Sequence, residues 1–459
     1  MSLNGFLSRE NIIAQPGFSR WLVPTAALSI HLCIGQIYAY SVFKLPLVSL
    51  LTGEEATLNW TEPQIAWIFS IALCLLGASA GVFGKWVERV GPRKSMFYSA
   101  VLFSSGFFVA SFGVYLHNIW LIYLGNGVLG GIGLGIGYIS PVSTLIKWFP
   151  DRPGLATGMA IMGFGGGAMI AGPLSLTLMN FFRTPGTQGV WQTFLVMGCV
   201  YFLFMMFGML TIRVPHPDWK PKGFDPSRIK KAKLITSNNV ILDNAIKTPQ
   251  FYLLAGVLML NVTAGIGILE QASLMIQRIF SEETVGKSAV TEAAGTGFVG
   301  LLSLFNMAGR FGWSSMSDRI GRKMTYMIFF IIGCILFLSL ATIGKSGNIA
   351  LFVITCGIII TMYGGGFATI PAYIRDLFGT IQVGAIHGRI LLAWAVAALL
   401  GPLLVNYISD YQIRILHIEK HLAYNFTFYL MAGFLVIGMF LNYLITPVHH
   451  EYHEKEGGS

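Results

Sequence analysis

Charged residues are scarce in this chain of 459 residues: Asp, Glu, Lys and Arg make up 11% of it, whereas 54% is hydrophobic. A soluble globular domain carries roughly 25% charged residues, so most of this surface cannot face water. The scarcity excludes an ordinary soluble domain and predicts an integral membrane protein whose surroundings are a lipid bilayer.

Cysteine is also rare. The five cysteines all fall in apolar segments, without the close pairing that a disulfide or a metal site needs: Cys33, Cys74, Cys199, Cys334 and Cys356. We interpret them as small packing residues and expect no metal and no cofactor.

Motifs of catalysis and nucleotide binding are lacking as well. The glycine clusters at 130–137 and 163–167 lie within apolar spans and set small residues one helical turn apart, which is typical of close helix packing. The Gly-Lys-Ser at 286–288 has Ser281 where a phosphate loop needs glycine. Since no nucleophile–base pair or cofactor loop is found either, the sequence predicts neither an enzyme nor a nucleotide-driven pump. The first twenty residues show no cleavable signal.

Long apolar stretches are what the chain has in abundance. A stretch of about 20 residues crosses a hydrocarbon core ~30 Å thick. The sequence predicts twelve such helices, at 21–49, 64–83, 95–115, 118–146, 155–182, 191–212, 250–279, 291–317, 324–344, 348–373, 386–410 and 423–446.

The second half of the chain repeats the first. The run ERVGPRK at 88–94 returns as DRIGRK at 318–323, with the two acids 230 positions apart (318 − 88), and Pro141 and Pro371 keep that offset. Such a register predicts an all-α transporter fold of two six-helix halves. The expected division is a segment at 1–20, a half at 21–212, a linker at 213–249, a half at 250–446 and a tail at 447–459.

The positive charges predict the orientation, because Lys and Arg are retained in the cytoplasm. With both termini inside, the cytoplasmic segments hold 22 of the 30 Lys and Arg, and the external loops hold six. The net charge of +10 therefore reports topology rather than a nucleic-acid partner. We expect a plasma membrane location, a bacterial inner membrane in particular, and interpret the basic stretch at 220–233 as a solvated linker near anionic headgroups.

The two charged runs are candidate gates. Each places an acid, bases and a glycine in a tight turn after the second helix of its half, where acid and base can pair across the halves or along helix ends and so latch one conformation. The alternative is a topological anchor of positive charge. The candidate gating residues are Glu88, Arg89, Arg93, Asp318, Arg319 and Arg322.

Arg310 is the principal candidate for substrate binding. It lies eight positions before Asp318, so it sits ~12 Å inside the membrane boundary, where an unpaired guanidinium is costly. A carboxylate substrate would compensate it through two parallel charge-assisted hydrogen bonds. The alternative is a structural ion pair with Glu270, which by helical rise belongs to the outer half of the membrane.

Several polar and aromatic residues are further candidates at mid-membrane depth. Gln36, Tyr38, Tyr138 and Tyr363 can donate hydrogen bonds to substrate oxygens, although a lone tyrosine in a membrane more often packs between helices. His31 ranks below them. His387 and Arg389 are interpreted as inner-surface anchors or gate contacts.

Three segments carry a family resemblance: GQIYAYSVF at 35–43, KWFPDRPGLATG at 147–158 and NMAGR at 306–310. With the charged run, which resembles the signature of the major facilitator superfamily, they are similar to the oxalate/formate antiporter family, itself related to monocarboxylate transporters. The resemblance implies that Arg310 binds substrate carboxylate and that Gln36, Tyr38 and Tyr138 belong to the cage around it.

One departure from that family concerns charge. Its members that handle oxalate carry a lysine in helix 11, whereas the span at 386–410 has none, and Trp394 is the aligned residue. One fixed cation matches one carboxylate better than a dianion, because a second desolvated negative charge would lack a partner.

The sequence therefore predicts a secondary transporter that moves a small monocarboxylate such as formate, pyruvate or lactate by alternating access. It would work either as an anion exchanger or as a proton symporter. Glu270 is the one acid nominated for proton coupling. A monomer is expected. The alternatives are an oxalate/formate antiporter, a transporter-like sensor, and an exporter of other small molecules, for which Arg310 would repel cationic substrates.

Overall fold

The computed structural model describes residues 3–50, 59–184, 187–216, 219–221, 234–236, 238–286 and 289–454. Within these ranges the fold is all-α, as predicted. The elements of the first half are α1 (Leu3–Phe6), η1 (Glu10–Ile12), η2 (Arg20–Leu22), α2 (Val23–Ile34), η3 (Gly35–Phe43), α3 (Lys44–Val48), α4 (Glu62–Val90), α5 (Pro92–Tyr115), α6 (Ile119–Ile122), η5 (Tyr123–Leu129), α7 (Gly130–Trp148), α8 (Pro153–Phe182) and α9 (Val190–Thr211). Those of the second half are α10 (Leu242–Ala245), α11 (Pro249–Ile279), α12 (Glu282–Val285), α13 (Glu292–Ile320), α14 (Arg322–Lys345), α15 (Ile349–Phe378), α16 (Val383–Arg414), α17 (Asn425–Leu444) and η8 (His450–Tyr452).

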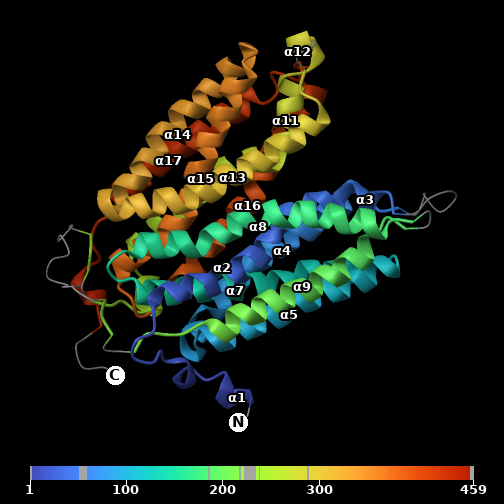
Figure 1. Cartoon of the computed structure of the whole chain (residues 1–459). Helices are drawn as coiled ribbons and strands as arrows, with labels where there is room; N and C mark the ends of the chain where they lie inside the picture. The colour runs from blue at the N-terminus through green and yellow to red at the C-terminus, as the bar shows by residue number, and fades with distance from the viewer. Residues whose placement is uncertain are drawn as a thin grey trace.

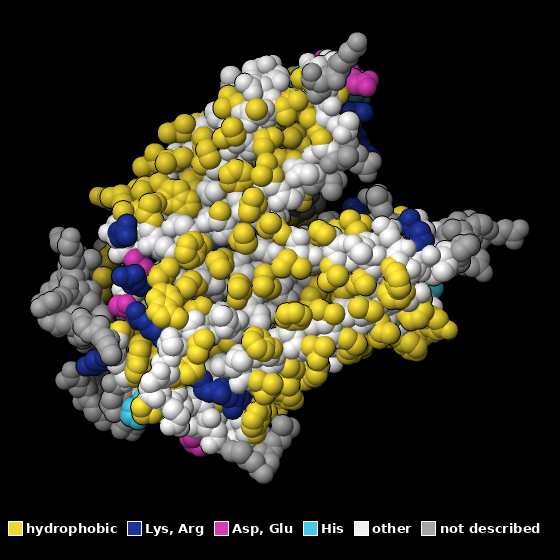
Figure 2. Space-filling model, viewed as in Figure 1, with side chains coloured by type: hydrophobic (Ala, Val, Ile, Leu, Met, Phe, Trp, Pro, Cys, Tyr) yellow, Lys and Arg dark blue, Asp and Glu magenta, His cyan; other side chains and the backbone are white. Residues whose placement is uncertain are grey.

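Eleven helical segments of the described chain are long and apolar enough to cross a membrane. The twelfth predicted span is α13, which has 29 residues, as α4 has. It is less apolar than α4 because it carries polar residues and Arg310 in its interior. Figure 2 shows apolar side chains covering the sides of both halves, with the visible Lys, Arg, Asp and Glu gathered toward the two ends of the bundle. Large exposed residues such as Leu203, Ile335 and Phe440 belong to this apolar belt, which suits contact with lipid.

The first span is not one regular α-helix. After α2 it continues as a nine-residue 3₁₀ stretch, η3, which carries Gln36 and Tyr38. The change falls at Gly35, which lies so close to α8 that a Cβ there would be 2.5 Å from the Phe164 carbonyl oxygen. A 3₁₀ run of this length is unusual and marks a specialised segment.

The charged runs are mostly helical, where the sequence predicted turns. α4 continues through Val90 and α13 through Ile320, and a single glycine then separates each from the next helix. Gly91 (φ 84°) and Gly321 (φ 88°) adopt the left-handed region that favours glycine. Glu88 and its counterpart in the second half therefore lie on the last turn of a helix.

The two halves meet mainly through two helix pairs, with smaller contacts of α15 with α8 and of α16 with α7. α4 packs along α16, and α8 packs along α13. Figure 1 shows the halves close together at the end where both termini lie, which we call the termini end, and diverging toward the opposite end, near α12 and α3. The candidate site lies between these helix pairs.

Candidate functional site

Arg310 lies on α13 at the interface between the halves, with 0% of its surface exposed. Its Nε donates to Asn306 Oδ1 at 2.9 Å, one helical turn away. The guanidinium carbon lies 5.4 Å from the ring centre of Phe164 on α8 and 5.1 Å from that of Phe367 on α15. Nη1 and Nη2 have no hydrogen-bond partner among the described residues. The two nitrogens of the fork that suit a carboxylate are therefore the two left unused.

Glycines make room for this arginine. A Cβ at Gly165 of α8 would lie 3.1 Å from Cδ and Nε of Arg310, and one at Gly364 of α15 would lie 3.1 Å from its Cγ. Gly158 faces the backbone of the same stretch of α13. Part of the glycine cluster at 163–167 thus serves close packing against the charged side chain.

Three tyrosine hydroxyls surround the guanidinium without a hydrogen-bond partner in the described part of the chain: those of Tyr38, Tyr138 and Tyr363. The rings of Tyr38 and Tyr138 lie 5.1 and 5.3 Å from Phe164. Tyr363 lies 5.3 Å from Phe367. All three side chains interact electrostatically with the arginine or with one another. The structure thus brings these predicted residues together around one cation.

Gln36 on η3 and Trp394 on α16 are buried as well. Trp394 of α16 packs 5.6 Å from the Phe367 ring, and its indole N–H has no described partner. The Gln36 amide nitrogen is likewise buried and unpartnered among the described residues. An unpaired buried donor costs about 1–3 kcal/mol, so this concentration of free donors indicates a binding region.

Two histidines flank Tyr138. The His31 ring lies 5.5 Å from it, with Nε2 at 3.2 Å from the Tyr138 carbonyl oxygen. The His387 ring lies 5.8 Å from it, and neither ring nitrogen has a described partner. The sequence interpretation made His387 and Arg389 inner-surface anchors or gate contacts. Arg389 is exposed, but His387 is 1% exposed, because α16 begins at Val383 and the other half covers its first turns.

Glu270 belongs to α11, but its side chain lies outside the described residues. Its nominated role in proton coupling and its pairing with Arg310 stay predictions.

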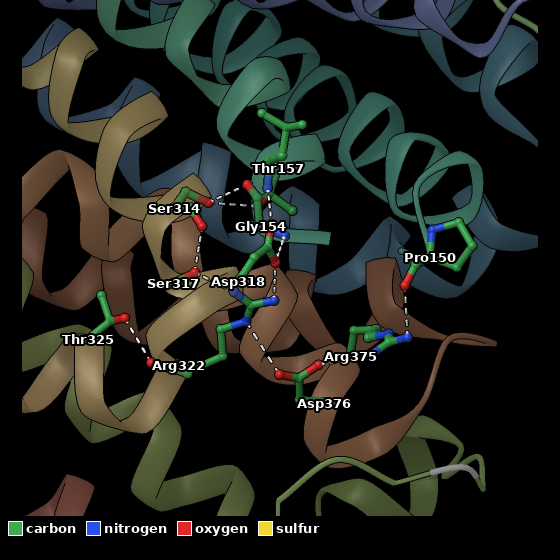
Figure 3. A network of polar contacts seen from close by, with 12 residues as sticks. Pro150, Gly154, Thr157, Ser314, Ser317, Asp318, Arg322, Thr325, Arg375 and Asp376 are labelled. Carbon is green, nitrogen blue, oxygen red and sulfur yellow. Dashed lines mark hydrogen bonds and ion pairs between the residues drawn. The ribbon is translucent and has the colours of Figure 1, made fainter. Parts of the chain in front are cut away.

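Asp318 binds across the halves. Its carboxylate accepts the backbone N–H groups of Gly154 and Leu155, at 2.8 Å each, at the start of α8 (Figure 3). It also pairs with Arg322 at 2.5 Å, and Arg322 in turn contacts Asp376 at 3.3 Å. A carboxylate at a helix N-terminus satisfies unpaired N–H groups and complements the helix dipole. We call this set of contacts the Asp318 latch.

Hydroxyl groups extend the Asp318 latch toward the site. The Ser314 hydroxyl donates to the Gly154 carbonyl at 2.6 Å and lies 3.0 Å from the hydroxyl of Thr157, as Figure 3 shows. From the same face, Arg375 donates to the Pro150 carbonyl at 3.3 Å. Several bonds therefore join α13 and α15 to the start of α8.

Glu88 forms the corresponding contact in the first repeat. Its carboxylate accepts the backbone N–H of Gly384 at 3.0 Å, at the start of α16 in the other half. It also accepts from Ser143 at 2.5 Å and from Lys147 at 2.6 Å, both in its own half. We call this set the Glu88 latch.

The other candidate gating residues lie apart from these contacts. Arg89 and Arg319 are exposed. Arg93 is buried and donates to the carbonyls of Phe6, at 3.2 Å, and Leu210, at 3.4 Å, within its own half. Arg93 thus holds the N-terminal segment, while the acids make the contacts between the halves.

Some residues of the site escaped the sequence reasoning. The spacing of four between Asn306 and Arg310 on a helix was a readable signal, since such residues face each other. Phe164 and Phe367 offered none, because aromatic residues are frequent throughout the chain.

The fold and the site define a membrane transport protein: two repeated helical halves enclose a buried cation that has no ion pair among the described side chains, and paired contacts close one end. The family model of the Major Facilitator Superfamily matches residues 32–402 and 289–459, so the chain belongs to that superfamily and is a transporter, not an enzyme. It is 24% identical over 382 residues to the MFS-type transporter YhjX of Escherichia coli (83% of this chain, 86% of that protein). It is also 24% identical over 384 residues to the oxalate:formate antiporter of Oxalobacter formigenes, 83% of either protein.

Solved structures agree on the fold. The proton:xylose symporter XylE superposes with a TM-score of 0.68 over 93% of this chain and 96% of its own, at 14% identity.

A further relative by sequence is mouse monocarboxylate transporter 2, which is 25% identical over 446 residues, 92% of this chain and 84% of that protein.

Proposed function

We propose that this protein is a secondary transporter of a small monocarboxylate, with Arg310 binding the carboxylate and the two halves moving about it. The observation that carries the proposal is the buried guanidinium whose Nη1 and Nη2 have no partner among the described residues. A carboxylate accepts two parallel charge-assisted hydrogen bonds from such a fork. The similarity to the oxalate:formate antiporter and to monocarboxylate transporters points to the same substrate class.

The surroundings of the guanidinium favour a small, partly apolar anion. Phe164 and Phe367 line its faces, and tyrosine hydroxyls are available for further substrate oxygens. Among the described side chains of the site, Arg310 is the one with a fixed positive charge. The lysine that related oxalate carriers have in the eleventh helix is replaced here by Trp394. One fixed positive charge balances one carboxylate, so formate, pyruvate or lactate fits better than oxalate.

Alternating access needs contacts that form in one conformation and break in the other. The Asp318 and Glu88 latches supply them at the termini end, and the arginine is sealed from solvent while they are closed. We place the termini end in the cytoplasm of a plasma membrane protein, because most Lys and Arg belong to segments on that side.

The test is uptake of radiolabelled formate, pyruvate, lactate and oxalate into proteoliposomes by wild type, Arg310→Lys and Arg310→Ala. Loss of two charge-assisted bonds should lower monocarboxylate uptake by about 100-fold or more in the alanine variant. The lysine variant should recover part of the loss, because it keeps the charge without the fork. Arg414→Ala is the matched control, since Arg414 is 75% exposed and pairs with Asp410 on its own helix. Alanine-variant uptake equal to wild type would make Arg310 structural, and preferred uptake of oxalate would favour the second candidate, oxalate/formate exchange.

A further inference from the structure

The repeat places His387 where the first half has a different kind of group. At the offset of 230, His387 corresponds to Thr157 and Gly84 corresponds to Ser314. In one latch, Thr157 and Ser314 form a hydroxyl pair at 3.0 Å. In the other, Gly84 has no side chain and packs against the backbone of Gly384 and Ala385, and the position of the threonine is taken by the imidazole of His387. A titratable group thus replaces a neutral, satisfied one.

His387 lies between the Glu88 latch and the substrate site. Three residues, or ~4.5 Å along α16, separate it from Gly384, where Glu88 binds. Its ring contacts that of Tyr138, which interacts with Arg310. A change of charge on this imidazole would therefore be felt by both the gate and the anion site.

The imidazole of His387 has no counter-charge in the described part of the chain. It forms no ion pair there, and both ring nitrogens lack a partner. Of the titratable groups on neighbouring elements, Tyr138 on α7 and His31 on α2 face His387, whereas Tyr363 on α15 faces Arg310. The charged groups are engaged elsewhere: Glu88 on α4 binds Gly384 and Lys147 of α7, and Asp243 on α10 pairs with Lys85 at the surface. The side chain of Glu270 on α11 lies outside the described residues.

We propose that His387 binds the proton that is transported together with the carboxylate, so that the protein is a proton symporter. The proposal rests on the proposed function. Burial opposes charge on an unpaired imidazole, whereas an anion bound at Arg310 cancels the positive charge already in the site and so favours a second one. By linkage, the proton then strengthens anion binding by the same factor.

His31 is less suited to this role and provides a comparison. Its Nε2 is engaged with the Tyr138 carbonyl, at 3.2 Å, and its ring is the one that interacts directly with Arg310. A proton on His31 would meet the fixed cation at close range. His387 has two free nitrogens and interacts with His31 rather than with the arginine.

The test compares wild type, His387→Asn and His31→Asn in proteoliposomes. For formate, pyruvate and lactate, we measure accumulation driven by an inward proton gradient and exchange without a gradient. His387→Asn should lower the ratio of accumulation to exchange by about tenfold or more. The variant loses the group that binds the proton, whereas Arg310 still binds the anion. The ratio should stay at the wild-type value in His31→Asn. An unchanged ratio in His387→Asn, or wild-type transport without proton-driven accumulation, overturns the proposal while leaving carboxylate transport in place.

A second measurement counts protons directly. Calorimetric titration of the detergent-purified protein with pyruvate, in two buffers that differ in ionisation enthalpy, should show about one proton bound per anion in wild type and none in His387→Gln. Equal proton uptake by wild type and His387→Gln overturns the assignment. If the wild-type protein neither binds nor transports any of the three acids, the proposed function itself is wrong, and that result is distinct from a failure of the His387 assignment.

Discussion

The two latches descend from one repeated sequence, yet they hold the halves together unequally. Asp318 accepts hydrogen bonds from two backbone N–H groups of the opposite half. Glu88 accepts one such bond, from Gly384, and its other hydrogen bonds, with Ser143 and Lys147, lie within its own half. Ser314 adds a hydroxyl bond to Gly154 on the Asp318 side. On the Glu88 side, its counterpart is glycine.

The two repeats have therefore kept the position of this contact more closely than its strength. A charge-assisted hydrogen bond contributes about 1.5–3 kcal/mol, so one bond more or fewer changes an equilibrium by roughly tenfold or more. The Asp318 latch is expected to hold the closed end, and the Glu88 latch, which lies beside His387, is expected to release first. The weaker side is also the side where a titratable group borders the gate.

Asp318→Asn should give the largest effect. It weakens the bonds to two backbone N–H groups and removes the charge that Arg322 pairs with, so the open population at the termini end should rise about 100-fold. Spin labels at the exposed positions Arg89 and Arg319 allow the distance between the halves to be measured there by pulsed electron resonance.

The matched control for that variant is Asp410→Asn, because Asp410 is an exposed acid whose ion pair, with Arg414, lies within α16. The control should leave the distance distribution as in wild type. A distribution for Asp318→Asn that matches wild type would contradict the role of the latch.

Glu88→Gln should act in the same direction with a smaller magnitude. One cross-half bond is weakened, which predicts a rise of about tenfold in the open population. The same label pair measures it. If the effect of Glu88→Gln equals or exceeds that of Asp318→Asn, the two latches are not unequal in the way their contacts indicate.

Much of this arrangement was accessible from the sequence. The repeat predicted two six-helix halves, and a rise of ~1.5 Å per residue placed Arg310 deep in the bundle. Composition excluded a soluble domain and predicted the membrane protein that the fold and the superfamily confirm. These inferences depend on local pattern and on periodicity, which a single chain displays.

The partners of the charged runs were not accessible. The sequence predicted acid–base pairing across the halves or along helix ends. Asp318 does pair with Arg322 four positions on, at the end of α13, but across the halves both acids reach backbone N–H groups, those of Gly154 and Gly384 at helix starts. Backbone groups carry no sequence signal, and which helix start faces which acid depends on how the halves dock. The burial of His387 was not accessible for a related reason: its surroundings come from α7 and α2, far away in the sequence.

Ser314→Ala tests the hydroxyl part of the asymmetry. It removes bonds to the carbonyls of Gly154 (2.6 Å) and Ala368 (2.9 Å) and leaves the Thr157 hydroxyl without its cross-half partner. Only the Gly154 and Thr157 contacts join the halves, and a neutral bond contributes about 1 kcal/mol, so the open population should rise about fivefold. Ser339→Ala is the control, because that hydroxyl bonds within its own helix. No change in the Ser314 variant would assign the whole difference to the acids.

The smallest effect is expected at the surface ion pair of Lys85 and Asp243, which joins α4 to α10 beside the Glu88 latch at 2.7 Å. The hydrogen bond from Lys85 holds the pKa of Asp243 below its ordinary value, with further help from the charges of Lys85, Lys247 and Arg389. A lowered carboxyl pKa contributes stability above the ordinary value of 3.8, and this contribution is lost as the pH falls through the folded-state pKa. Because both side chains are well exposed, salt screens the attraction. Asp243→Asn should therefore lower the midpoint of thermal unfolding slightly at neutral pH and low salt, and match wild type at high salt or well below pH 4. A large decrease that persists at high salt would show that this contact, rather than Glu88, holds the weaker side closed.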